Sequence, residues 1–368
     1  MLRTRTWALT ALVGALFFSA SACSEDELNG TPTARFADVG PYPVGVRRLD
    51  MGDRQLEVWY PAQPGSETGH SLAGYRAVEF LPDAILNILP QELKDLVVEM
   101  PAYRDLPIGS DGPFPVMTFS HGAGGFRLAY SALLAGIASH GIVVASIDHI
   151  EWGLLAFVGI PPTSQREPDE LVLSTLALLH DESENPHSPL AGGVDVSRVA
   201  TAGHSAGGRA AFALLDRPEI KTAIGYATVG NPSDANGKPI LYMVGALDEL
   251  IAGLEASYAQ LPPIKRLVSV TNAGHNSFTD QCAIIHGGNN IIELVRNAGL
   301  PLPDNLAELA LDGCREENLA PAEFWRVVQH FTVAHLRAVF GIDRKPVDLA
   351  PQVVEAFDPV QVHYLSAE

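Results

Sequence analysis

A serine set among glycines is the residue of this chain whose surroundings most favour covalent chemistry. Residues 202–208 (AGHSAGG) lie between a short apolar run, Val199–Ala202, and a helical pattern that begins near Ala206. A Gly-x-Ser-x-Gly sequence between a strand and a helix is typical of a nucleophile elbow, which holds the hydroxyl above a sheet at a helix N-terminus. We therefore predict that Ser205 is a nucleophile.

A base and an acid follow this serine in the order that such a nucleophile needs. A serine hydroxyl reacts poorly unless a base takes its proton and an acid orients that base. Asp248 comes just after the apolar run Ile240–Val244, and His275 comes just after the next run, Arg266–Val270. Because the carboxyl ends of parallel strands open on one crevice, we expect Asp248 and His275 to meet Ser205 there.

A second glycine cluster predicts a place for negative charge. Residues 121–125 (HGAGG) follow the apolar run Phe114–Phe119. A dinucleotide-binding fingerprint would need a further glycine where Arg127 stands. The cluster fits instead one half of an oxyanion hole, in which the main-chain N–H groups of Ala123 and Ala206 face the developing charge.

These residues need a sheet to bring them together, and the rest of the pattern predicts one. Six apolar, β-rich runs alternate with helical stretches. The runs are Phe114–Phe119, Ile142–Ile147, Val199–Ala202, Thr222–Thr228, Ile240–Val244 and Arg266–Val270, and the clearest helices are Ala129–Ser139, Glu170–His180, Ala206–Leu215 and Ala322–Phe340. Such alternation is typical of an α/β fold with a mostly parallel sheet covered on both faces. We expect one catalytic domain over residues 39–345.

Other segments are predicted to surround this domain. Gln55–Tyr60 indicates an antiparallel start to the sheet, and residues 346–368 are expected to be a C-terminal extension. Residues 84–98 have helical apolar spacing interrupted by Pro90, which suits either a lid or a plain helix over the sheet.

The N-terminus carries the features of an export signal. Arg3 and Arg5 are followed by an almost wholly apolar stretch, residues 7–18, and then by small residues. Residues 1–22 are the predicted signal, and residues 23–38 the predicted tether. The sequence Ala-Ser-Ala-Cys at 20–23 resembles the bacterial lipoprotein signal, in which Cys23 would be lipidated and would anchor the chain in the cell envelope. An ordinary signal peptidase would also accept it and leave a secreted chain with a free Cys23.

Two cysteines remain after that cut, Cys282 and Cys314. In an exported chain they are most simply one disulfide, which would close a cap segment over residues 282–314. Two separate thiols are the alternative. A metal site is disfavoured because no Cys-x-x-Cys or paired histidine accompanies them, so we expect no metal.

Several motifs together resemble one family. They are VGPYPVG at 39–45, YP at 60–61, HGAGGFRLAYS at 121–131, ASHGIVVASIDH at 138–149, GHSAGG at 203–208 and HNSFTD at 275–280. These motifs are similar to those of the platelet-activating-factor acetylhydrolase family. The resemblance implies an α/β-hydrolase fold and removal of short acyl groups from phospholipids without metal or cofactor.

The chain departs from that family in the place of the acid. The eukaryotic plasma-type enzymes resembled here carry it after the strand that follows the elbow helix. In this chain that strand, Thr222–Thr228, is followed by no carboxylate until Asp234. This favours Asp248, although Glu249 adjoins it.

The sequence as a whole therefore indicates a serine carboxylester hydrolase that acts through an acyl-enzyme on an ester or lipid substrate. A formal net charge of −19, scattered along the chain, disfavours nucleic acid as a partner. We expect a monomer bound to a membrane through its N-terminal lipid. The alternatives are a polyester or cutinase-like hydrolase, and a non-catalytic surface lipoprotein that binds lipid.

Overall fold

The computed structural model of this 368-residue chain describes residues 33–230, 237–288, 291–297, 299 and 303–367. Residues 32–368 form one compact unit. The signal, the greater part of the tether with Cys23, and Asp234 lie outside the described residues.

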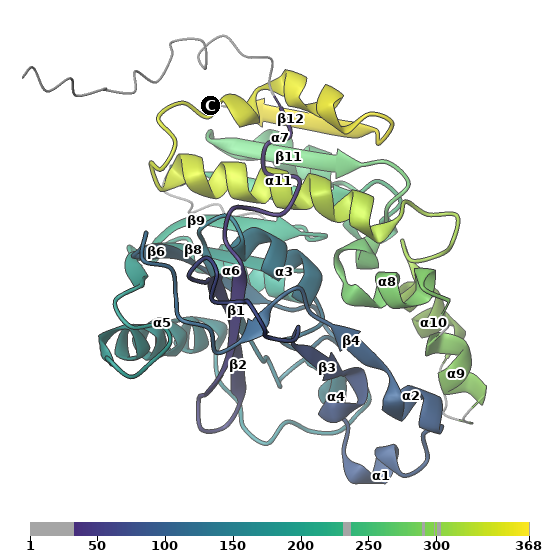
Figure 1. The fold of residues 1–368 in the computed structure, drawn as a ribbon. Coiled ribbons are helices and arrows are strands. Elements are labelled where there is room, and N and C mark those ends of the chain that lie inside the picture. The colour runs from purple at the N-terminus through teal and green to yellow at the C-terminus, as the bar shows by residue number, and fades with distance from the viewer. Residues whose placement is uncertain (1–32, 231–236, 289–290, 298, 300–302, 368) are drawn as a thin grey trace, which may run out of the picture. The chain divides into compact units, whose positions relative to one another are not determined.

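A ten-stranded sheet crosses the described part of this unit (Figure 1). Its strands, in sheet order, are β12 (Val362–Ala367), β11 (Lys265–Val270), β10 (Ile240–Gly245), β9 (Ile220–Tyr226), β8 (Val194–His204), β6 (Phe114–Ser120), β7 (Val143–Ile147), β2 (Gln55–Pro61), β1 (Val44–Asp50) and β5 (Tyr103–Arg104). Strands β7, β6, β8, β9, β10 and β11 pair in parallel, whereas β2 and β12 join them antiparallel. The predicted α/β class and the six predicted central strands are confirmed.

Burial on both faces explains why the central strands are apolar without alternation. All seven residues of β6 are buried, and so are all five of β7 and all six of β10. Strand β8 begins at Val194 rather than at the predicted Val199, because residues 194–195 pair with Phe114 and Pro115 before the register shifts.

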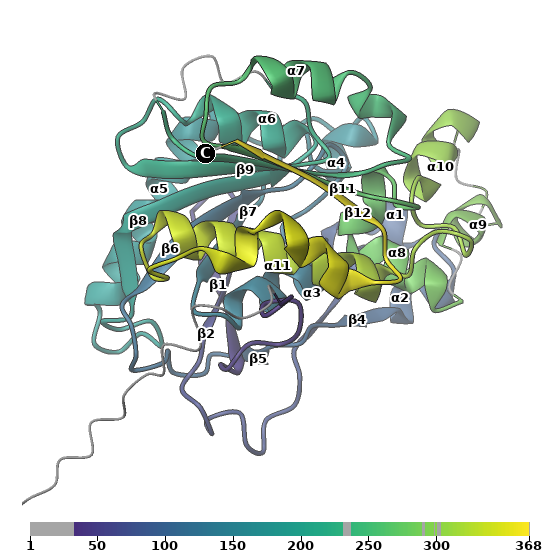
Figure 2. The ribbon, with the colours of Figure 1, turned by 90° about the horizontal axis from the view of Figure 1, so that it is seen from above.

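Helices cover the two faces in separate sets (Figure 2). On one face α3 (Ser131–Ala138) and α11 (Pro321–Val339) pack against the sheet and share one apolar core. On the other face α5 (Pro168–Glu184), α6 (Ala206–Ala213) and α7 (Leu254–Gln260) share a second core. Four further helices are α4 (Leu154–Phe157), α8 (Asp280–His286), α9 (Ile291–Asn297) and α10 (Asp304–Leu311).

The segment 84–98 is not one helix. It forms two short helices, α1 (Asp83–Leu86) and α2 (Gln91–Asp95), because Pro90 stands immediately before the second. It ends in β4 (Val97–Glu99), which pairs antiparallel with β3 (Gly74–Arg76) in a small separate sheet.

Both predicted domain boundaries need correction. The C-terminal extension, predicted outside the domain, supplies β12, which pairs with the whole length of β11. The predicted tether enters the fold before its end, since Phe36 and Ala37 are buried in the core shared by α3 and α11. In the ranges that the structure describes, no helix combines the length and the apolar character needed to cross a membrane.

Candidate active site

Ser205 stands at a sharp turn between β8 and α6, as predicted. Its φ of 53° and ψ of −115° are strained for a residue with a side chain, and such strain is typical of a nucleophile elbow. Two hydrogen bonds hold it, one from Ser205 N to Tyr226 O at 2.9 Å and one from Thr228 Oγ1 to Ser205 O at 2.9 Å. A Cβ on Gly207 would lie 2.1 Å from Ser120 O, so only glycine lets α6 approach the end of β6 so closely.

Asp248 and His275 meet beyond the carboxyl ends of β10 and β11. His275 Nδ1 lies 2.7 Å from Asp248 Oδ2, and both side chains are buried. The other carboxylate oxygen, Oδ1, accepts the main-chain N–H of Leu250 at 3.0 Å. A proton held on Nδ1 by the carboxylate leaves Nε2 of His275 with a lone pair, as a general base requires.

The elbow at Ser205 and the loop that carries His275, residues 271–281, are joined by His204. We call residues 271–281 the histidine loop. His204 Nε2 donates to the main-chain oxygen of His275 at 2.8 Å, and the two rings lie 4.8 Å apart. Within the described residues no hydrogen bond joins the Ser205 hydroxyl to the His275 imidazole. Such bonds are often long before substrate arrives, so the adjacency of the two loops is the relevant observation.

The loop at 121–125 leaves one of its amides unused. Its three glycine amides donate within the protein, Gly122 to Tyr130 Oη, Gly124 to Trp152 O and Gly125 to Gly122 O. The N–H groups of Ala123 and Ala206 have no acceptor in the described part of the chain. This loop abuts the elbow, since a Cβ on Gly122 would lie 3.3 Å from Ser205 Cβ. Two free donors therefore flank Ser205, as an oxyanion hole requires.

Two buried histidines support this loop and were not predicted as site residues. His121 Nδ1 lies 2.9 Å from Gly122 O, and His149 N donates to His121 Nε2 at 3.0 Å. The His149 ring stacks on Trp152 with centroids 4.2 Å apart. Burial holds the pKa of His149 well below its usual range, so this ring is a neutral packing group. Asp148 and His149 were part of the resembling motif, which was the available signal.

Arg127, which stands where a dinucleotide fingerprint would have glycine, uses its side chain to form ion pairs beneath the glycine loop. Its guanidinium contacts Asp148 Oδ2 at 3.0 Å and the fully buried carboxylate of Glu57 at 3.3 Å. Arg48 and Arg104 also contact Glu57. Burial alone would raise the pKa of Asp148, but His121 and Arg127 lower it below its usual range. The side chain at 127 thus anchors the glycine loop to the sheet.

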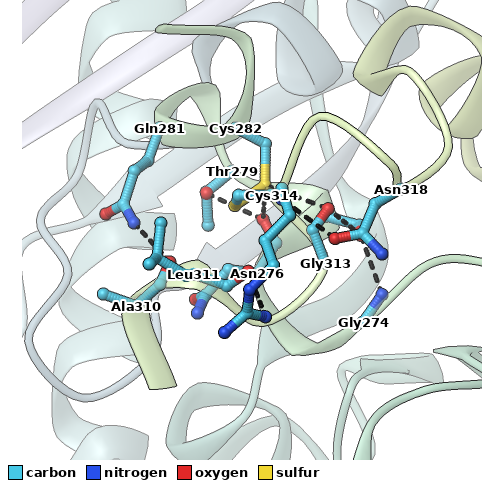
Figure 3. The surroundings of a disulfide bond; sticks show 12 residues. Gly274, Asn276, Thr279, Gln281, Cys282, Ala310, Leu311, Gly313, Cys314 and Asn318 are labelled. Carbon is cyan, nitrogen blue, oxygen red and sulfur yellow. Dashed lines mark hydrogen bonds between the residues drawn. A yellow bond between two sulfur atoms is a disulfide. The ribbon is translucent and has the colours of Figure 1, made fainter. Parts of the chain in front are cut away.

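The predicted disulfide is present between Cys282 and Cys314, and it lies directly behind the histidine loop (Figure 3). Asp312 reaches the same loop and was not foreseen, because nothing near it in the sequence points to His275. Among the described residues, no group of three or more His, Cys, Asp or Glu side chains could hold a metal ion.

An apolar cavity of about 160 Å³ opens beside the glycine loop. Gly125 and Phe126 of that loop line it, together with Phe80 and with Leu154 and Leu155 of α4. Its size is close to that of a cavity that holds one benzene ring.

The N-terminal part of the described chain is similar in sequence to one known family. A sequence model of the family described as platelet-activating factor acetylhydrolase, isoform II, matches residues 38–157. The platelet-activating factor acetylhydrolases of Cavia porcellus and Canis lupus familiaris are 31% and 33% identical over 124 residues, 30% of this chain and 27% of theirs. Chlorophyllase-1 of Citrus unshiu is 30% identical over 148 residues, 40% of each chain. The matched part of this chain thus spans about a quarter of the length of those acetylhydrolases.

One solved structure extends the likeness of fold over most of the chain. A ferulic acid esterase from Streptomyces cinnamoneus superposes with a TM-score of 0.58 at 22% identity, covering 89% of this chain and 98% of that one. The sheet order and the strand–turn–helix at Ser205 agree with this likeness of fold. The chain has the α/β-hydrolase fold, and its residues 38–157 are similar to the platelet-activating factor acetylhydrolase family.

Proposed function

We propose that this protein is a serine carboxylester hydrolase that acts through an acyl-enzyme. The observation that carries the proposal is the 2.7 Å contact of Asp248 with His275, beside a serine held in a strained elbow conformation. The names of the similar proteins support the reaction class, since they include acetylhydrolases and an esterase.

The proposed mechanism assigns one task to each group. Ser205 Oγ attacks the ester carbonyl carbon while its proton passes to His275 Nε2, and Asp248 stabilises the imidazolium that forms. The negative charge on the carbonyl oxygen is held by the N–H groups of Ala123 and Ala206. When the tetrahedral intermediate collapses, His275 gives the proton to the departing alkoxide. Water then attacks the acyl-serine by the same steps and releases the acid.

The proposed substrates are esters of short acyl groups, such as acetylated phospholipids. The match to the acetylhydrolase family over residues 38–157 supports this class.

A series of nitrophenyl esters from acetate to palmitate tests this proposal, with Ser205→Ala as the control. We expect turnover to be fastest for acetyl or butyryl esters and to vanish in the variant. Faster turnover of the palmitoyl ester would indicate a lipase, and soluble fragments released from a polyester film would indicate a polyester hydrolase. Lipid binding with no hydrolysis of any ester would leave only a binding protein.

We further propose that the chain is exported and anchored through lipidated Cys23, with residues 24–34 as a polar tether. Replacement Cys23→Ser should move the protein from the detergent phase to the aqueous phase. A wild-type protein whose mature N-terminus has an unmodified mass would instead be a secreted one. More than one acyl chain is needed for stable anchoring, so the mass should report several.

A further inference from the structure

A second carboxylate lies at the histidine loop. Asp312 directly follows α10 and is half-buried. A Cβ on Gly274 would lie 2.1 Å from Asp312 Oδ1 and 2.6 Å from Gly313 N. Glycine at 274 is therefore what lets this carboxylate sit against the residue that precedes His275.

The charges of Asp248 and His275 both affect the pKa of Asp312. Burial raises the pKa of Asp312 above its usual range, and the negative charge of Asp248 raises it further. The main-chain N–H of His275, its imidazole and Arg315 act in the opposite direction. Asp312 thus interacts with both members of the pair and with the main chain that carries the imidazole.

The segment that carries Asp312, residues 309–314, is bound along the histidine loop, and we name it the return segment (Figure 3). Four hydrogen bonds join them: Asn276 N to Asp312 O at 2.9 Å, Asn276 Nδ2 to Leu309 O at 2.5 Å, Ser277 Oγ to Gly313 O at 3.1 Å and Gln281 Nε2 to Ala310 O at 2.6 Å. The carboxylate therefore has a defined position.

The disulfide fastens the return segment to the end of this loop. Cys314 follows Asp312 by two residues, and Cys282 follows the loop in α8. Both cysteines are fully buried. A covalent link so close to Asp312 limits how far its carboxylate can move from His275.

We propose that Asp312 is a second acidic positioning residue of the active site, held beside His275 by the Cys282–Cys314 disulfide. This proposal rests on the proposed function only in so far as His275 is the general base of ester hydrolysis. Its electrostatic part concerns the imidazole itself and holds whatever the substrate.

The direction in which loss of the Asp312 charge changes protonation of the His275 ring follows from the groups around that ring. Asp248 contacts it from the loop after β10, and the His204 ring lies beside it at the elbow. The Asp312 carboxylate lies against Gly274, the residue before His275. Burial keeps the pKa of His204 well below its usual range, so this ring is neutral. A negative Asp312 favours the imidazolium, and its loss should lower the pH at which His275 is half-protonated.

The test is Asp312→Asn, read first by NMR titration of the His275 ring, whose signal is assigned from its loss in His275→Asn. We expect the titration of the ring to move to lower pH. The acid limb of the kcat/KM profile should move in the same direction, and kcat should fall about threefold, a modest loss because a half-buried charge is partly screened.

Two controls separate charge from structure. Asp304→Asn makes the same charge change on an exposed carboxylate in the same cap segment and should leave the titration unchanged. Asp312→Glu keeps the charge and should hold the titration near that of the wild type, even if its longer side chain disturbs the loop. The double variant Cys282→Ser/Cys314→Ser should shift the titration in the direction of Asp312→Asn.

An unchanged titration in Asp312→Asn would overturn the proposal, and an unchanged titration in the cysteine variant would overturn the role of the disulfide. If Asp312→Asn fails to fold, Asp312→Glu becomes the test. A clear shift of the His275 ring titration in Asp312→Glu, which keeps the charge, would overturn the proposal. Absence of ester hydrolysis by the wild type would refute the proposed function while leaving the titration decisive for Asp312.

Discussion

The positive φ of Ser205, 53°, is maintained by close main-chain packing on both sides of it. Gly203 and Gly207 lie so close that a Cβ on Gly203 would come within 2.3 Å of the Gly207 main chain. The same crowding brings the end of β6 and the glycine loop against the elbow. At the scale of the residue, the site is thus a matter of main-chain contact as much as of reactive side chains.

The proposed role of Asp248 as the catalytic acid can be tested by single substitutions. Asp248→Asn should lower kcat about 10⁴-fold, because the imidazole loses the group that selects its tautomer and stabilises its charged form. Ser205→Ala should lower kcat about 10⁶-fold. The measurement is steady-state hydrolysis of a short nitrophenyl ester, with circular dichroism to verify folding.

Glu249→Gln and Asp234→Asn serve as the comparison variants, since each removes a carboxylate near the predicted acid. Both should retain most of the activity. If Asp234→Asn were the crippling change, the acid would follow the strand one position earlier, as in the plasma-type enzymes, and the assignment of Asp248 would be wrong.

Helix α3 shows how an element of this fold is completed from a distance. Tyr130 precedes it and offers no side-chain cap, yet the first two amides of the helix are not free. Asp280, from α8, accepts Ser131 N at 2.8 Å and Ala132 N at 3.1 Å, and Tyr75 Oη donates to it at 3.1 Å. One buried carboxylate therefore ties the histidine loop to the helix that follows the glycine loop.

This carboxylate should make stability depend on pH. Burial raises the pKa of Asp280 to about 6, although the amides of Ala132 and Ser131 lower it. The folded state then binds more protons than the unfolded state between about pH 4 and pH 6, so the contribution is present below pH 4 and is lost as the pH rises through 6. Relative to Asp280→Asn, the wild type should lose about 3 kcal/mol of unfolding free energy across this window.

Urea unfolding of both proteins at several values of pH measures that difference. Other carboxylates titrate in both proteins, so they cancel in the comparison. If the unfolding free energies of the two proteins changed with pH in parallel from pH 4 to pH 7, the pKa of Asp280 would not be raised. Its hydrogen bonds would then fully offset the burial of its charge.

The disulfide acts on the element that it closes. The cysteines are separated by 32 residues, and closing a loop of that length stabilises a fold by about 3–4 kcal/mol in the chain-entropy account. Cys282→Ser/Cys314→Ser should lower the unfolding free energy by this amount, as measured in urea without reductant. Reductant should weaken the wild type equally and leave the variant unchanged, and two reactive thiols in the untreated wild type would contradict the bond.

At the scale of the whole molecule, the two ends of the compact unit are packed against α11. Phe36 N donates to His330 Nδ1 at 3.2 Å, and Arg35 pairs with Asp348 at 2.7 Å. After Asp348 the chain buries Val353 and Phe357 and then runs back as β12 along the edge of the sheet. The C-terminal segment is therefore a part of the core.

A protein truncated after residue 345 should therefore fold poorly. The truncation removes three buried apolar side chains, Leu349, Val353 and Phe357, and exposes the whole edge of β11, which invites pairing between molecules. We expect an insoluble product, or a midpoint of thermal unfolding lower by more than about 10 °C. Deletion of residues 1–33 is the matched control and should leave that midpoint unchanged. A soluble truncated protein of normal stability would show that β12 is dispensable.

The central strands, the elbow at Ser205 and the order of Ser205, Asp248 and His275 could be predicted from the sequence. Each of these rests on local patterns, namely continuous apolar runs, a glycine-rich turn and the place of a residue just after a strand. The pairing of Cys282 with Cys314 was equally accessible, because only two cysteines remained to pair.

The place of β12, the capping of α3 by Asp280 and the position of Asp312 beside Gly274 and Asn276 could be seen only in the folded chain. Asp280 lies 149 residues from Ser131, and the N–H of Asn276 meets the Asp312 carbonyl 36 residues further along the chain. Contacts of such separation leave no periodicity in the sequence, since they depend on where the chain returns after crossing the sheet. A short half-exposed strand such as β12 likewise has no continuous apolar run to mark it, and it becomes a strand because the edge of β11 offers it partners.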